Sequence, residues 1–113
     1  MQRVPVSIAA TQLGTSASTL YTVPTATTTT LSNFSFTNTS ANPVPITVYN
    51  VPSAGAAGTG NVVVSGYTLS PGQTYVPPQL IGLNMAAGAT LQALAGTAAV
   101  VNAQGGAYQT TGS

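Results

Sequence analysis

Apolar and polar side chains alternate over short stretches of this chain, which is the pattern of β-strands with one buried face. In one such stretch Val44, Ile46 and Val48 fall on the same side. Tyr49 falls on the opposite side and is expected to be partly exposed. No window has the 3.6-residue spacing of a helix without Gly or Pro inside it. The predicted strands cover residues 2–13, 19–23, 31–39, 44–51, 61–69, 74–76, 80–85, 90–95 and 97–103.

Turn residues separate these stretches. Ser70-Pro71-Gly72-Gln73 fits a type II turn, with Pro71 and Gly72 at its two central positions. About eight to nine short strands spaced by such turns predict an all-β fold, a single antiparallel β-sandwich. The pattern does not separate a jelly-roll topology from an immunoglobulin-like one.

The chain divides into three predicted parts. Residues 1–12 form an N-terminal edge strand or arm, because Pro5 interrupts the alternation there and proline avoids central strands. Residues 13–103 form the β-sandwich domain. Residues 104–113 form a polar C-terminal tail in which Tyr108 is the only bulky side chain.

Composition excludes most chemistry. The sequence contains no Asp, Glu, His, Cys, Lys or Trp, and Arg3 is its only charged side chain. Of the usual acid–base catalysts only Tyr remains, and a Ser or Thr nucleophile needs a neighbouring base to activate it. Metal sites need thiolate, imidazole or carboxylate ligands. We therefore expect no enzyme activity, no catalytic residues, no metal site and no cofactor.

The same composition limits the partners. One Arg cannot supply the phosphate contacts of a nucleic-acid-binding protein or the attraction to an anionic membrane. No apolar run is long enough for a membrane-spanning helix, and Pro5 and Ser7 make the first residues a poor secretory signal. A formal net charge of +1 favours association, so a homo-oligomer is expected.

Candidate interface residues come from two sources. Tyrosines are enriched in protein interfaces because they combine a large contact area with a polar end. The N-terminal stretch could add a strand to a neighbouring subunit, or it could be an ordinary first strand. The candidates from these two sources are Arg3, Val4, Val6, Ile8, Tyr49, Tyr67, Tyr75 and Tyr108.

Five short motifs follow one another along the chain. They are Thr-Leu-Tyr-Thr-Val-Pro (19–24), Leu-Ser-Asn-Phe-Ser-Phe-Thr-Asn-Thr-Ser (31–40), Pro-Ile-Thr-Val-Tyr (45–49), Leu-Ser-Pro-Gly-Gln-Thr-Tyr (69–75) and Ala-Gly-Ala-Thr-Leu-Gln-Ala (87–93). Their order resembles that in small virion proteins of tailed bacteriophages, and the resemblance covers about residues 15–100. It implies a β-sandwich component of the particle, often a trimer at the three-fold positions of the shell. Relatives of this kind usually carry several charged residues, so this chain is not expected to dock through salt bridges.

Three functions are compatible with these observations. The first is a capsid decoration, or cement, protein that binds the major capsid protein or other virion subunits as a trimer. The second is a tail, baseplate or fibre-associated subunit. The third is a carbohydrate-binding host-attachment module. The first two place the protein in the phage particle, the decoration protein on its surface, after synthesis in the host cytoplasm.

Overall fold

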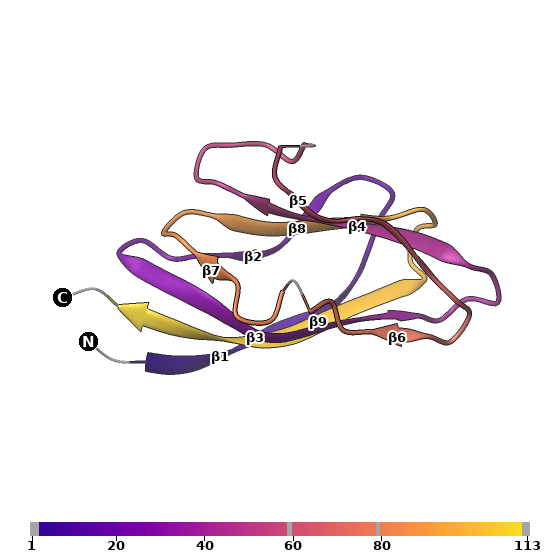
Figure 1. Ribbon diagram of the computed structural model, residues 1–113, viewed down its shortest axis with the longest axis horizontal. Coiled ribbons are helices and arrows are strands. Elements are labelled where there is room, and N and C mark those ends of the chain that lie inside the picture. The colour runs from indigo at the N-terminus through magenta and orange to yellow at the C-terminus, as the bar shows by residue number, and fades with distance from the viewer. Residues whose placement is uncertain (1–2, 59, 79, 112–113) are drawn as a thin grey trace.

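The computed structural model describes residues 3–58, 60–78 and 80–111, which form two antiparallel sheets packed face to face (Figure 1). Sheet A contains, in spatial order, β1 (Arg3–Gln12), β9 (Val101–Thr111), β3 (Thr27–Asn38) and β6 (Thr74–Tyr75), and β7 (Asn84–Met85) also pairs with β3. Sheet B contains β2 (Ser18–Thr22), β8 (Thr90–Ala95), β4 (Val44–Val51) and β5 (Val62–Leu69). The predicted antiparallel β-sandwich is confirmed.

The strand pairing is nested along the chain. β4 pairs with β5, β3 with β6 and β7, β2 with β8, and β1 with β9. Since β6 and β7 both pair with β3, they act as one interrupted strand, and the described elements then make an eight-stranded fold. Two sheets of four strands with this nesting form a jelly roll rather than an immunoglobulin-like sandwich.

The core lies between the two sheets and is built from alternate positions of their strands. In β4 the predicted alternation of buried and partly exposed side chains is confirmed, because Val44, Ile46 and Val48 are buried and Tyr49 is half-buried. In β3 the centroids of the Phe34 and Phe36 rings, both in the core, lie 5.2 Å apart. The largest fully buried side chains are Phe34, Phe36, Leu13, Leu31, Ile46, Leu69, Leu80, Met85, Leu91, Val23, Val44 and Val48.

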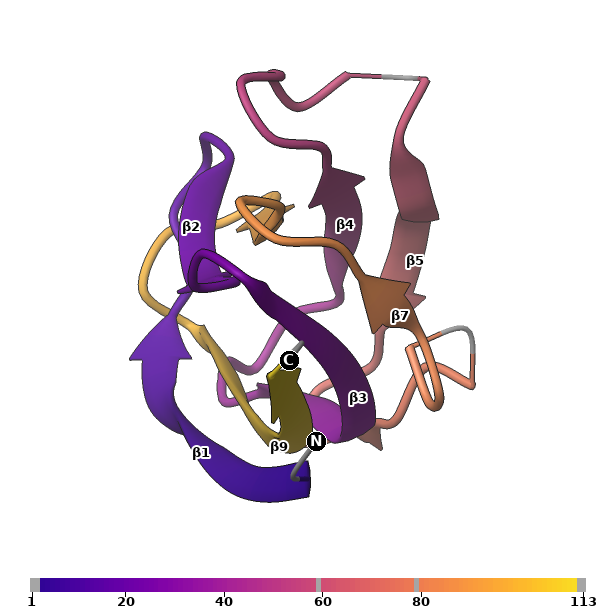
Figure 2. The same cartoon turned by 90° about the vertical axis from the view of Figure 1, so that its left-hand side faces the viewer.

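β1 occupies an edge of sheet A and pairs only with β9 within that sheet (Figure 2). Pro5 therefore stands where its missing N–H can face away from the sheet. The strand from Arg3 to Gln12 pairs with β9 of its own chain, as an ordinary first strand does. Residues 1–2 of the predicted edge strand and 112–113 of the predicted tail lie outside the described residues.

The prediction of a C-terminal tail is wrong for residues 104–111, which continue β9 as a central strand between β1 and β3. The inward positions of this strand are small: Ala103, Gly105 and Ala107. A strand that alternates small and polar residues lacks the large apolar side chains by which strands are recognised. The pattern in the sequence was therefore too weak to indicate it.

Other predicted boundaries also move. The strand predicted at 97–103 begins only at Val101, because Gly96 to Val100 make a turn in which Ala99 has a left-handed φ of 60°. The strand predicted at 80–85 is reduced to β7, because Leu80 lies in a turn and donates its N–H to the carbonyl of Pro77 at 3.1 Å.

β3 starts earlier than predicted, at Thr27 rather than residue 31. Thr27 and Thr29 are buried and thus behave as core positions of the strand. The hydroxyl of Thr29 is hydrogen-bonded to the hydroxyl of Tyr21 at 3.0 Å, so its burial leaves no unpaired polar atom. The run of threonines was not predicted as part of this strand because its buried members are not apolar.

Candidate interaction surfaces

The described residues contain no cluster of metal-ligating side chains. No group of three or more His, Cys, Asp or Glu side chains occurs among residues 3–58, 60–78 and 80–111. In the same part of the chain no helix is long and apolar enough to cross a membrane. The candidate functional sites are therefore surfaces, and three of them differ from the rest of the protein.

The first surface lies on the edge of the sandwich where β5 ends sheet B and where β6 and β7 pair with β3 of sheet A; Figure 2 shows β5 and β7 on this side. Tyr67 on β5 stacks on Tyr75 on β6, with ring centroids 3.9 Å apart. Tyr67 remains 38% exposed, and the segment after β6 exposes Val76 by 45% and Ile81 by 53%. We call Tyr67, Val76 and Ile81 the apolar edge.

The local sequence explains why the apolar edge is exposed. Pro77 and Pro78 cannot donate backbone hydrogen bonds, so the edge strand stops after Tyr75 and resumes only at Asn84. Between these strands the chain turns, and Ile81 points away from the core. Sequence patterns did not indicate Val76 or Ile81 as surface residues. The Pro-Pro pair beside two β-branched residues is the feature that could have done so.

The second surface is the end of sheet A that carries the N-terminal candidates. Val4 is 42% exposed, Val6 is half-buried, and Tyr108 is 38% exposed. Ile8 is buried in the core, which corrects its place among the candidate interface residues: the alternation that marks an arm also marks the inner face of a first strand. Arg3 pairs with β9 through its backbone, and its side chain lies outside the described part of the structure.

Tyr49 belongs to neither of these surfaces. It lies on the outer face of sheet B, half-buried, opposite Val62 on one neighbouring strand and Gln92 on the other. The predicted candidates are thus divided among the apolar edge, the β1–β9 end and the outer face of sheet B. The fold does not bring them together into one patch.

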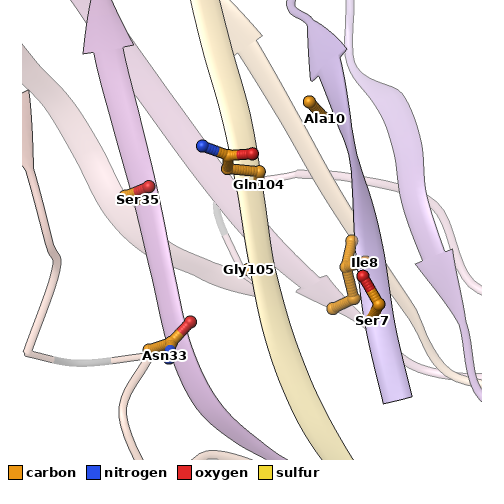
Figure 3. Close-up of a pocket in the computed structure, with 7 residues that line it drawn as sticks. All are labelled: Ser7, Ile8, Ala10, Asn33, Ser35, Gln104 and Gly105. Carbon is orange, nitrogen blue, oxygen red and sulfur yellow. The ribbon is translucent and has the colours of Figure 1, made fainter.

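The third surface includes two of the predicted candidates, Val6 and Ile8, but the sequence did not indicate its polar side chains. It is a groove on the outer face of sheet A, where side chains from β1, β9 and β3 surround Gly105 (Figure 3). The deeper part has a volume of about 340 Å³. Its lining consists of Ser7, Ile8, Ala10, Asn33, Ser35, Gln104 and Gly105. The register that aligns these strands is set by two β-bulges, which no pattern in the sequence marks.

Comparison with known proteins bears on the fold. No protein-family model and no curated protein matches the chain. The chain is similar to one in the structure of the infectious bursal disease virus Gx strain, with a TM-score of 0.54, 14% identity and coverage of 98% of this chain and 32% of that chain. It is also similar to a chain in the crystal structure of the T13 particle of the same virus, with a TM-score of 0.52, 10% identity and coverage of 96% and 30%.

This chain therefore spans about a third of the length of the viral chains that it matches. At these identities the likeness shows the fold alone. The fold of this chain is a single jelly-roll domain, similar to a part of the viral chains that it matches.

Proposed function

We propose that this chain is a non-enzymatic structural component of a virus particle and that it joins other subunits through uncharged contacts. The observation that carries the proposal is the superposition of nearly the whole chain on a domain of virus-particle chains. A sequence without Asp, Glu, His, Lys or Cys supports the non-enzymatic part, since such a chain lacks most of the groups that catalysis uses.

Within this class, the function supported best is that of a capsid decoration protein on a bacteriophage head. The motif order resembles small virion proteins of tailed phages. A decoration protein stabilises a shell by mass action, because it binds the assembled shell and not the dispersed subunits. The partner in this proposal is the major capsid protein, and the bound form is a trimer.

The apolar edge is the surface that best suits such a contact. A stable interface buries about 800 Å² on each partner, and the chain exposes 5555 Å² in total. Tyr67, Val76 and Ile81 supply exposed apolar area, while Val4, Tyr49 and Tyr108 supply further contacts on other sides. Because such contacts are uncharged, attachment should weaken little as salt is raised.

The number of copies per particle tests the proposal. Particles of the virus that encodes this chain are purified, and the chain is quantified against the major shell protein by mass spectrometry. Hundreds of copies per particle support a decoration protein. A handful would replace that role with a tail, baseplate or fibre subunit. If the chain is absent from particles but abundant in infected cells, the structural role itself is wrong.

A further inference from the structure

The groove on the outer face of sheet A runs across three strands. Its shallower part, about 500 Å³, is lined by Pro5, Val6, Ser7, Asn33, Gly105 and Gly106. Ser7, Asn33 and Gly105 line both parts, so the two depressions adjoin each other. The volume of each part lies within the range of about 300–1,000 Å³ that is typical of small-ligand sites.

The two glycines of the groove differ in whether the packing around them requires a glycine. A Cβ on Gly105 would lie 2.7 Å from a ring carbon of Phe34 and would also collide with the Asn33 carbonyl oxygen. The fold therefore requires Gly105. A Cβ on Gly106 would meet only the carbonyl oxygen of Val6, at an ordinary 3.6 Å, and Gly106 is not among the glycines with positive φ.

Packing therefore does not require Gly106 to be a glycine. A glycine inside a strand costs about 0.5–1 kcal/mol relative to alanine, and it often marks a place where a ligand approaches the backbone closely. Gly106 lies between Ser7 on β1 and Asn33 on β3 in the strand register. The missing side chain is what leaves the centre of this row open.

The side chains around the opening are neutral and have free hydrogen-bonding groups. Figure 3 shows Ser7 on β1, Gln104 on β9, and Asn33 and Ser35 on β3. None of these four side chains hydrogen-bonds to another residue in the described part of the chain. Elsewhere in sheet A neighbouring polar side chains hydrogen-bond to each other. The Thr30 hydroxyl, for example, donates to the Asn84 side-chain oxygen at 2.7 Å.

An aromatic ring borders one end of the groove. Tyr108 stands two residues beyond Gly106 on the same face of β9, next to Pro5 in the register, and is 38% exposed. The groove thus combines amides and hydroxyls, which both donate and accept hydrogen bonds, with the face of a ring. A neutral sugar needs this combination, because its hydroxyls donate and accept and its C–H face packs on an aromatic ring.

We propose that this groove binds a neutral oligosaccharide. None of the described residues that line the groove is charged, so this lining offers no cation to balance a sulfated or sialylated sugar. Its deeper part is lined mainly by hydroxyl and amide side chains, unlike the apolar centre that a protein partner would bury. Asn33 and Gln104 hydrogen-bond to hydroxyls of one sugar unit, and Tyr108 packs against the next. This site is separate from the apolar edge and does not depend on the role in particle assembly.

The test uses the full chain and a panel of neutral gluco-, galacto- and manno-oligosaccharides, with sialylated and sulfated oligosaccharides as the charged comparison. Titration calorimetry and amide chemical shifts report binding. We expect binding of at least one neutral oligosaccharide, with shifts centred on Ser7, Asn33 and Gln104, and no binding of the charged sugars.

Variants separate the site from the fold. Gly106→Val fills the opening and should abolish detectable binding while the melting temperature stays equal or rises. Asn33→Ala and Gln104→Ala should each weaken binding about tenfold, the loss expected when a hydrogen-bonding group is removed. Gly14→Val is the matched control, because a Cβ on Gly14 meets nothing within 4 Å, and it should bind like the original chain.

Three results would overturn the proposal: no neutral oligosaccharide binds, binding survives Gly106→Val, or charged sugars bind more tightly than neutral ones. Self-association that Gly106→Val removes, with no sugar bound by the original chain, would assign the groove to a second copy instead. None of these results bears on the number of copies per particle, so the assembly role is tested independently.

Discussion

Tyr67 and Tyr75 stack with their ring planes 4° from parallel and their centroids 3.9 Å apart. Tyr67 belongs to β5 at the edge of sheet B, and Tyr75 belongs to β6 at the edge of sheet A. The stack therefore joins the two sheets at the edge where the sandwich would otherwise be open. Tyr75 also packs against the core, whereas Tyr67 stays partly exposed.

This relationship predicts an energetic coupling between the two rings. Tyr67→Ala, Tyr75→Ala and the double variant form a double-mutant cycle, measured by urea unfolding. We expect a coupling of about 0.5–1.5 kcal/mol, the usual contribution of an aromatic pair beyond its buried area. Tyr49→Ala combined with Tyr75→Ala is the control, since Tyr49 lies on the outer face of sheet B. Additive losses in the Tyr67–Tyr75 cycle would show that the stack does not stabilise the fold.

The adjacent glycines of β9 predict opposite effects of the same substitution. Gly105→Ala places a methyl group against Phe34 and the Asn33 backbone, and should cost about 1–3 kcal/mol of unfolding free energy. Gly106→Ala meets no close atom and should stabilise by about 0.5–1 kcal/mol, because alanine restricts the unfolded chain. Chemical denaturation of both variants measures the difference. Equal destabilisation by both would contradict the packing described for Gly105.

These glycines also explain how much of the fold the sequence predicts. Strands with large buried side chains, such as Val44–Val51, follow from alternation alone. β9 does not, because Phe34 occupies the space above it and its own inward side chains must be small. The size of a buried residue depends on its partner in the opposite layer. A single strand's pattern does not contain that information.

The groove could not be predicted from the sequence for a related reason. Its polar side chains come from three strands that are distant in the chain, and two bulges set their register: one between Ile8 and Thr11, the other between Leu31 and Asn33. A shift of one residue in either strand would turn these side chains to the other face. Tyr108 was indicated as an interface residue by its type, but its neighbours were not.

The buried side-chain amide of Asn38 makes several hydrogen bonds, so its removal should lower the free energy of unfolding strongly. Its side chain is fully buried, and its nitrogen donates to the carbonyl oxygens of Asn42 at 2.8 Å and Leu69 at 3.1 Å. Its oxygen accepts from the Ser40 N–H at 2.9 Å. Asn38→Ala removes all three of these hydrogen bonds from a buried site and should cost about 2–3 kcal/mol in urea unfolding.

The matched control for Asn38 is Asn84→Ala, which removes one exposed hydrogen bond to Thr30. This variant should change the unfolding free energy by no more than about 0.5 kcal/mol. The corner between β3 and β4 depends on Asn38 only if the two variants differ as expected. Similar losses for both would mean that solvent replaces the Asn38 contacts.

The absence of acidic, imidazole and amine side chains predicts a flat pH profile. Stability changes with pH only where the folded and unfolded chains bind different numbers of protons. The sequence has no Asp, Glu, His or Lys side chain, so that difference stays near zero between about pH 5 and 8. Urea unfolding at several pH values in this window should give the same free energy within error. A rise or fall of more than about 1 kcal/mol would contradict the prediction, since it corresponds to a shift of nearly one pKa unit.

The apolar edge predicts where a new charge interferes with attachment to the particle. Ile81 is 53% exposed, so Ile81→Lys should leave the melting temperature nearly unchanged. If Ile81 is covered in the assembled particle, the substitution buries an unpaired charge, and binding to particles stripped of this chain should weaken about tenfold or more. Sedimentation of the purified variant with such particles measures the affinity.

Ala98→Lys supplies the same charge in the exposed turn between β8 and β9, away from the apolar edge, and should attach like the original chain. Unimpaired attachment of both variants would show that the edge around Ile81 faces solvent in the particle, because an uncompensated buried lysine always weakens an interface. Equal loss with both variants would show that the bound chain tolerates no added charge on either side. The contact would then extend around the sandwich, beyond the edge that Tyr67, Val76 and Ile81 define.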